Sequence, residues 1–103
     1  MTISEEVRIG QVVFIKKGRD REKYAVIVHI HDARYVCIAD GEKRKFDHMK
    51  RKNLLHLEVL PFRNDEIAYL IAQTGRVQNS KLRQTISQYI EQQHAEEIQT
   101  KGE

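Results

Sequence analysis

Three clusters of basic residues are the groups in this chain best suited to chemistry, and that chemistry is the binding of phosphates. Five cations fall within the eight positions from Lys16 to Lys23, three stand in a row from Lys43 to Lys45, and three more run from Lys50 to Lys52. Each cluster lies beside an apolar run, where a loop is expected. Lysines and arginines that converge repel one another unless a polyanion neutralises them. The alternative for any single cluster is a solvated surface that keeps the protein soluble.

The charge of the chain is distributed unevenly. The net charge is +3 over 103 residues, but residues 1–56 carry +5 and residues 57–103 carry −2. The positive field therefore belongs to the N-terminal half, which holds all three clusters. No apolar run approaches the roughly 20 residues of a membrane span. No secretory signal is visible between Met1 and Gly10, so we expect a cytoplasmic protein without a membrane partner.

Catalytic chemistry has no matching motif. The chain lacks a Gly-rich phosphate loop, a nucleophile elbow, an HExxH sequence and paired cysteines, so we expect neither an enzyme nor a cofactor. His29 and His31 alternate along one predicted strand and Cys37 lies on the next, which could form a three-ligand metal site. Because no fourth ligand is evident, we expect two surface histidines and a half-buried thiol there instead. A single cysteine also excludes an internal disulfide, which fits a reducing compartment.

Short strands are the first elements that must position these groups. Apolar and β-branched runs predict strands at residues 12–15, 24–30, 35–39 and 54–60, with a short polar strand at 44–47. The pair Asp40-Gly41 favours a hairpin turn, and Pro61 is expected to end the last strand. Five short strands within about 50 residues favour a small twisted barrel, because closure hides the sheet edges.

The pattern becomes helical after Pro61. Apolar residues recur at helical spacing over residues 67–74 and again over 82–90, with Gly75 as the stop between them. The short link predicts an antiparallel two-helix hairpin. The predicted fold class is therefore mainly β with a helical C-terminal part. The barrel spans residues 1–60, and the hairpin spans 61–103 and ends in a mobile polar tail, Gln99 to Glu103.

A family resemblance covers roughly half of the chain and depends on a set of short motifs in order. The motifs are the start Gly10-Gln11-Val12-Val13, Gly18-Arg19-Asp20 followed by Lys23, the strand 24–28, the turn Ala39-Asp40-Gly41 with Arg44-Lys45 after it, and the segment 50–57. Together they resemble the KOW family. The closer likeness is to the branch with an archaeal- and eukaryotic-type large-subunit ribosomal protein and short bacterial KOW-domain RNA-binding proteins.

This resemblance implies an SH3-like barrel of about five strands that contacts RNA through its loops. One position departs from the family pattern, since Glu22 stands where the family usually has a second glycine. A glycine there would let the backbone approach phosphate closely, whereas Glu22 adds a side chain and a negative charge at the loop tip. The helical third lies outside the KOW motif.

The charge pattern and the resemblance together predict a non-catalytic, ribosome-associated RNA-binding protein of the translation apparatus. We expect contact with structured ribosomal RNA, read by shape and backbone rather than by sequence. Tyr24 and Tyr35 would stack on bases if they face outward, and otherwise pack in the core. The alternative is a protein-interaction or regulatory module whose barrel and C-terminal helices dock a ribosomal or other protein partner. The predicted RNA-binding residues are Lys16, Lys17, Arg19, Arg21, Lys23, Lys43, Arg44, Lys45, Lys50, Arg51, Lys52 and His56.

Overall fold

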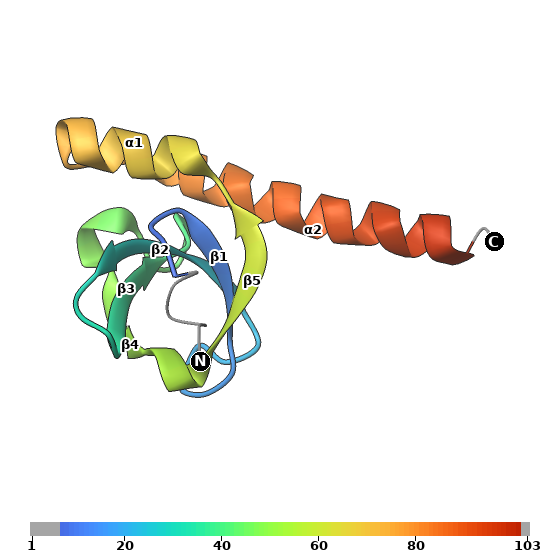
Figure 1. Cartoon of the computed structure of the whole chain (residues 1–103), viewed down its shortest axis with the longest axis horizontal. Coiled ribbons are helices and arrows are strands. Elements are labelled where there is room, and N and C mark those ends of the chain that lie inside the picture. The colour runs from blue at the N-terminus through green and yellow to red at the C-terminus, as the bar shows by residue number, and fades with distance from the viewer. Residues whose placement is uncertain (1–6, 102–103) are drawn as a thin grey trace.

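The fold is a five-stranded sheet followed by two helices. The computed structural model describes residues 7–101, with side chains described as far as Ala95. The strands are β1 (Gln11–Ile15), β2 (Tyr24–Ile30), β3 (Tyr35–Ala39), β4 (Lys50–Asn53) and β5 (Leu57–Arg63), and the helices are α1 (Asp65–Thr74) and α2 (Asn79–Lys101). The fold class predicted from the sequence, mainly β with a helical C-terminal part, is confirmed (Figure 1).

The sheet is antiparallel and open. Its strand order is β4-β3-β2-β1-β5, so β4 and β5 form its two edges. Within residues 7–101 these edges do not pair with each other, and the predicted closure into a barrel is therefore wrong. The sheet nevertheless curls around an interior (Figure 1). Charged Lys50 and Arg51 on β4 and Pro61 on β5 make both edges poor templates for further strands. Pro61 lies inside β5 rather than ending it, which an edge strand tolerates.

The connection between β3 and β4 differs from the prediction. The side chain of Asp40 accepts hydrogen bonds from the backbone N–H groups of Glu42 and Arg44, both at 2.8 Å, and so forms a turn. A single 3-10 turn follows at Phe46–His48, where a polar strand was expected. The fourth strand begins only at Lys50. The third basic cluster consequently lies in an edge strand and not in a loop.

Apolar side chains are buried on both faces of the sheet. On the face away from the helices, one cluster contains Val13, Ile15, Ala25, Ile27, Val36, Ile38 and Leu57. On the other face, the strand residues Val12, Val26, Val28, Ala39 and Leu60 pack with Phe46, Ile67, Val77, Leu82 and Tyr89. The helices therefore bury their apolar sides against the sheet, and sheet and helices share one core.

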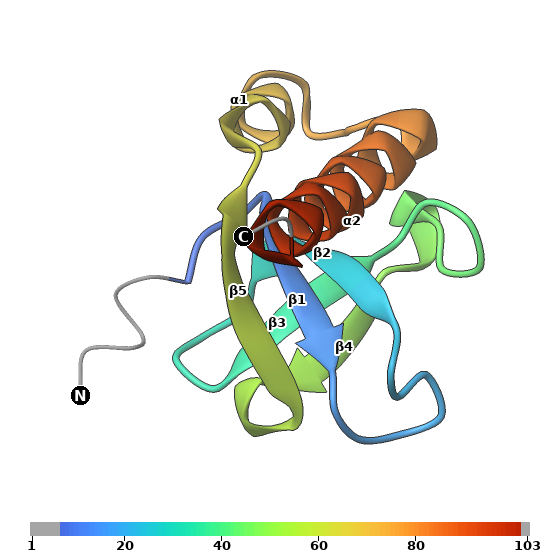
Figure 2. The same cartoon turned by 90° about the vertical axis from the view of Figure 1, so that its right-hand side faces the viewer.

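Helix α1 ends where expected, whereas α2 is longer than expected. The side chain of Asn64 caps α1 by accepting from the N–H of Glu66 at 3.0 Å, and Gly75 ends α1 with a left-handed φ of 79°. Helix α2 turns back across the sheet and extends past β5 (Figures 1 and 2). It continues to Lys101, through most of the predicted tail, while Gly102 and Glu103 lie outside the described residues. Neither helix is long and apolar enough to cross a membrane.

Candidate nucleic-acid interface

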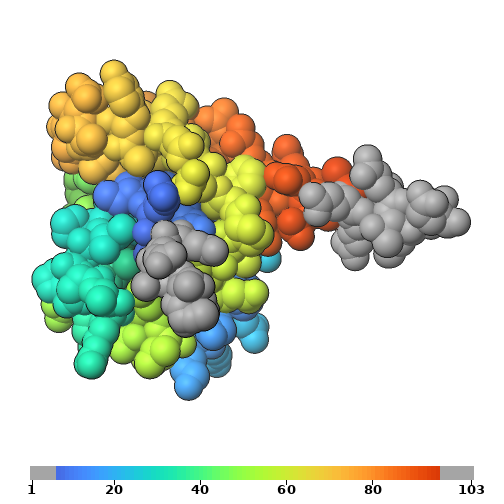
Figure 3. Space-filling model, viewed as in Figure 1, coloured from blue at the N-terminus to red at the C-terminus, as the bar shows by residue number. Residues whose placement is uncertain are grey.

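The loop between β1 and β2 carries five of the predicted RNA-binding residues. The N–H of Ile15 donates to the carbonyl of Lys23 at 2.9 Å, and the N–H of Glu22 donates back to the carbonyl of Ile15 at 2.6 Å. Gly18 and Glu22 both have positive φ, at 105° and 67°, and Glu22 is the only non-glycine residue in the described part that does. The lysines and arginines of this closed loop are exposed. The loop lies at the lower edge of the space-filling view (Figure 3).

Lys52 fastens this loop to the edge strand β4. Its side chain is only 7% exposed, and its Nζ donates to the carbonyl oxygen of Lys17 at 2.9 Å. A Cβ at Gly18 would lie 2.5 Å from that Nζ, so the glycine makes room for the contact. Burial lowers the pKa of Lys52, and the like charge of Lys50 adds to the effect. Lys52 therefore lies beneath the loop and holds it to β4, so its ammonium group is not among the exposed cations.

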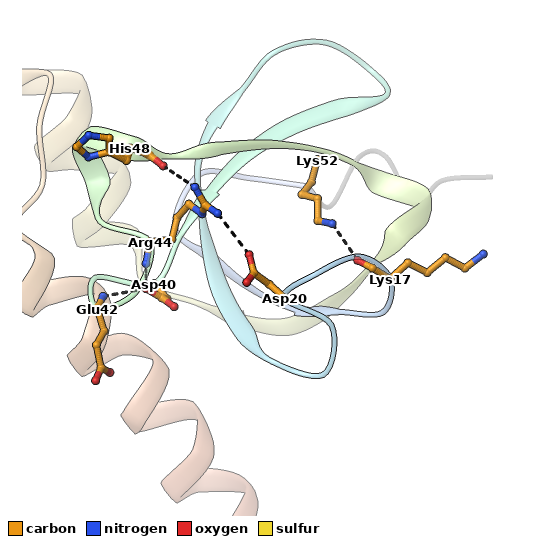
Figure 4. A network of polar contacts seen from close by, with 7 residues as sticks. All are labelled: Lys17, Asp20, Asp40, Glu42, Arg44, His48 and Lys52. Carbon is orange, nitrogen blue, oxygen red and sulfur yellow. Dashed lines mark hydrogen bonds and ion pairs between the residues drawn. The ribbon is translucent and has the colours of Figure 1, made fainter.

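Arg44 joins the β3–β4 connection to the same loop. Its Nη2 lies 3.6 Å from Oδ2 of Asp20, and its Nη1 donates to the carbonyl of His48 at 3.4 Å (Figure 4). Both partners of the ion pair are partly exposed, so the pair contributes at most about 1 kcal/mol. Its main consequence is geometric, since it holds the second basic cluster beside the first.

Helix α2 holds the other side of this connection. Oδ1 of Asn79, at the start of the helix, accepts from the N–H of Phe46 at 2.7 Å. One turn further on, Nη1 of Arg83 donates to the carbonyl of Gly41 at 2.6 Å. The helical part of the chain thus positions the basic connection, a role that the sequence did not indicate for either residue.

Most of the predicted residues meet at one end of the sheet. Antiparallel pairing places the β1–β2 loop and the β3–β4 connection at the same end, because β2 starts where β3 finishes. The backbone N–H of Lys16 also donates to the carbonyl of His56 at 2.8 Å, which brings that residue to the loop. Of the twelve predicted residues, Arg44 alone forms an ion pair with a carboxylate in the described part of the chain.

Arg51 stands apart from the other members of its cluster. Successive residues of a strand point to opposite faces, so Arg51 projects away from the side that Lys50 and Lys52 share. Its guanidinium lies 5.3 Å from the ring centre of Tyr35, within the range of a cation–π contact. Lys45 is exposed, and within residues 7–95 no hydrogen bond or ion pair of its side chain ties it to the loop either.

The two candidate tyrosines have different environments. The ring centre of Tyr24 lies 5.3 Å from that of Phe14 and 5.6 Å from that of Tyr89, in the layer between sheet and helix. Tyr24 therefore packs against the core, the alternative considered for it. Tyr35 is half-buried on the outer side of β3 beneath Arg51.

Two aspartates organise the site and were not predicted from the sequence. Asp40 shapes the β3–β4 turn through its two backbone hydrogen bonds, and Asp20 accepts the Arg44 contact. For Asp40 the sequence signal is the pair Asp40-Gly41, which indicates a turn but not the direction of the arginine that follows it. Asp20 lies within the first basic cluster, and nothing in that cluster indicates its contact with Arg44.

The His29, His31 and Cys37 set does not form a metal centre among the described side chains, in which no group of three or more His, Cys, Asp or Glu is placed to hold an ion. His29 and Cys37 do pair across β2 and β3. Burial raises the pKa of the Cys37 thiol, and nearby Arg51 opposes that rise.

Fold and site together define a small protein in which a curved open sheet, backed by two helices, presents cations from its connecting segments. No family model matches the chain. The chain is 37% identical over 71 residues to the "Putative ribosome-binding protein YbzG" of Bacillus subtilis (strain 168), a match that covers 69% of this chain and 96% of that protein. The chain belongs to the same family as this relative, which is named for ribosome binding.

Proposed function

We propose that this protein binds the ribosome in the cytoplasm and does so through structured ribosomal RNA, without catalysing a reaction. The name of the Bacillus subtilis relative supports the ribosome as partner. The residues that resemble the KOW family support RNA as the component contacted. The absence of a catalytic motif in the sequence supports a binding role.

The observation that carries the proposal is the convergence of basic segments that are distant in sequence. The hydrogen bond from Lys52 to Lys17 and the ion pair of Arg44 with Asp20 join the β1–β2 loop, the β3–β4 connection and β4. The cations around these contacts are largely unpaired with carboxylates in the described residues. When a fixed cluster of unneutralised cations binds phosphates, the nucleic acid releases its counterions, and this release favours binding.

The first experiment measures how the affinity for RNA depends on salt. With about five phosphate contacts, the logarithm of the affinity for a structured ribosomal RNA fragment is expected to fall with a slope of roughly −3 to −5 against the logarithm of salt concentration. Filter binding gives this slope directly. Co-sedimentation with ribosomes over the same salt series tests the whole partner. A flat salt profile in both assays would refute the proposal.

A matched pair of double variants locates the surface. Arg19→Gln with Arg21→Gln removes two exposed cations of the β1–β2 loop, and is expected to reduce the salt slope by roughly 1.4 to 1.8. Arg8→Gln with Arg34→Gln removes the same charge from the opposite end of the sheet, and is expected to leave the slope nearly unchanged. Equal losses in the two variants would point to non-specific attraction.

The helices give less support to the alternative of a protein-docking module. Leu82 is fully buried and Ile86 is packed against the core, so α2 uses most of its apolar side to cover its own sheet. Ile90, a third apolar residue of α2, is 45% exposed and remains open to a partner. Ribosome binding that resists high salt and is lost on Ile90→Ala would favour this alternative.

A further inference from the structure

A cavity opens between the β1–β2 loop and the β3–β4 connection. Its volume is about 140 Å³. The apolar part of its lining comes from the sheet and the polar part from the two connecting segments. The apolar lining residues are Ile15, Ala25, Ile38 and Ala39, and the polar ones are Asp20, Lys23, Asp40, Lys43 and Arg44.

The floor of the cavity suits a flat apolar ring. Its four residues are at most 3% exposed and lie in three neighbouring strands. The short side chain of Ala25 leaves space that a larger residue would fill, whereas Ala39 directs its side chain to the helix-covered face and borders the cavity from there. An apolar cavity of roughly 150 Å³ holds one benzene ring. This volume matches one six-membered ring better than a fused pair of rings.

The rim offers hydrogen-bond acceptors that a polyanion alone would not need. Oδ1 of Asp40 is used by two backbone N–H groups, which fixes this carboxylate in place and leaves its second oxygen without a bond in the described residues. Asp20 contacts Arg44 through Oδ2 only, at 3.6 Å. Each carboxylate therefore keeps one oxygen that can accept a hydrogen bond from a ligand with donors of its own.

Cations flank the same opening. Lys23 and Lys43 are exposed members of the lining, and neither forms an ion pair with a carboxylate between residues 7 and 95. They can reach the phosphates on either side of a nucleotide whose base enters the cavity. Single-stranded bases in RNA are commonly bound in this way, inserted into pockets while the backbone is held by basic side chains.

We propose that this cavity receives one unpaired pyrimidine of the bound RNA and prefers cytosine. The exocyclic amino group of cytosine donates to the carboxylates of Asp20 and Asp40, whereas uracil places a carbonyl oxygen at the same position. A purine, with its fused pair of rings, fits this volume less well. The inference rests on the proposed function, since it names the nucleotide that the same basic surface would hold.

The experiment compares RNA hairpins that are identical except for one bulged nucleotide, which is cytosine, uracil, adenine or an abasic residue. Wild-type protein is expected to bind the cytosine bulge about fivefold more tightly than the uracil bulge, and both more tightly than the other two. Fluorescence anisotropy at fixed low salt measures the four affinities. Ala25→Val, which narrows the floor, is expected to reduce the preference for a bulged pyrimidine.

Two charge-matched variants separate base recognition from general attraction. Asp20→Asn removes a negative charge, so overall affinity for every hairpin is expected to rise, while the ratio of cytosine to uracil binding falls toward one. Glu42→Gln makes the same charge change nearby but outside the cavity lining, and is expected to raise affinity with the ratio unchanged.

The outcomes distinguish the two proposals. Equal affinity of wild-type protein for all four hairpins, with a steep salt dependence, would overturn the cavity assignment and leave RNA binding intact. Absence of measurable binding to any hairpin and to ribosomal RNA would overturn both. Thermal unfolding of each variant shows whether a lost preference reflects a lost fold, and the wild-type ratio decides the question even if a variant does not fold.

Discussion

Glu22 provides the sharpest test of how the basic loop is built. It has a left-handed φ of 67°, a conformation that glycine adopts without strain and other residues do not. The hydrogen bond from its N–H to the carbonyl of Ile15, at 2.6 Å, fixes this conformation. Its side chain is exposed and makes no described contact, so substitution changes the backbone preference and the charge and little else.

The magnitude follows from comparing glycine with alanine at this position. A left-handed conformation costs a non-glycine residue about 1 to 2 kcal/mol. Glycine avoids this strain, but it also lowers the free energy of unfolding by about 0.4 to 1 kcal/mol because it makes the unfolded chain more flexible. Glu22→Gly is therefore expected to be more stable than Glu22→Ala by about 0.5 to 1 kcal/mol. In regular helices and strands the order is reversed, and alanine is the more stable residue.

Urea denaturation of the two variants measures the difference, which corresponds to roughly 2 to 8 °C in melting temperature. Filter binding with ribosomal RNA adds a second readout. Both substitutions remove the same negative charge from the loop tip, so both are expected to raise the affinity equally. An alanine variant at least as stable as the glycine variant would refute the backbone argument. A gain in affinity confined to glycine would show that backbone approach, and not charge, limits RNA contact.

Three further predictions concern the remainder of the fold. Leu82→Ala is expected to destabilise the protein by about 2 to 5 kcal/mol, because Leu82 is fully buried. Ile90→Ala is expected to destabilise it by less than about 1 kcal/mol. Equal losses of stability in urea denaturation would contradict the packing of α2. Burial raises the pKa of the Cys37 thiol, so native protein is expected to react with a disulfide reagent at neutral pH more slowly than protein in urea. Equal reaction rates would be inconsistent with a buried thiol. Hydrogen bonds from the N–H groups of Arg34 and Tyr35 lower the pKa of Asp32 below its usual 3.8. This carboxylate therefore contributes stability above pH 3.8, and that stability is lost as the pH falls through the pKa of the folded state. Asp32→Asn is therefore expected to flatten the acid side of the stability profile, and an unchanged profile would count against these hydrogen bonds.

The sequence predicted the elements of this fold well because their signals are local. The alternation of Val26, Val28 and Ile30 indicates a strand, and Gly75 marks where a helix ends. The β3–β4 segment was predicted wrongly, since a side chain of Asp40 that bonds to the backbone competes with strand formation without changing the apolar pattern. Pro61 was read as a strand end because an edge strand cannot be recognised before its neighbours are known.

The candidate surface was predicted in composition but not in geometry. The counts of lysine and arginine identified the clusters, and sheet pairing alone brought two of them to one end. Within a single cluster, the sequence could not separate Lys52, buried beneath the loop, from Arg51, which lies against Tyr35 on the opposite face. The cavity and its two aspartates also required the curvature of the sheet.

The sequence by itself determined which segments become strands and helices and that the N-terminal half is cationic, because turn residues, periodicity and charge act over a few neighbouring positions. Tertiary structure decided that the sheet stays open, which of the basic side chains face solvent, and that loops far apart in the chain enclose a ring-sized cavity. Those features arise from long-range strand pairing and from the exclusion of water between surfaces, and neither can be read from adjacent residues.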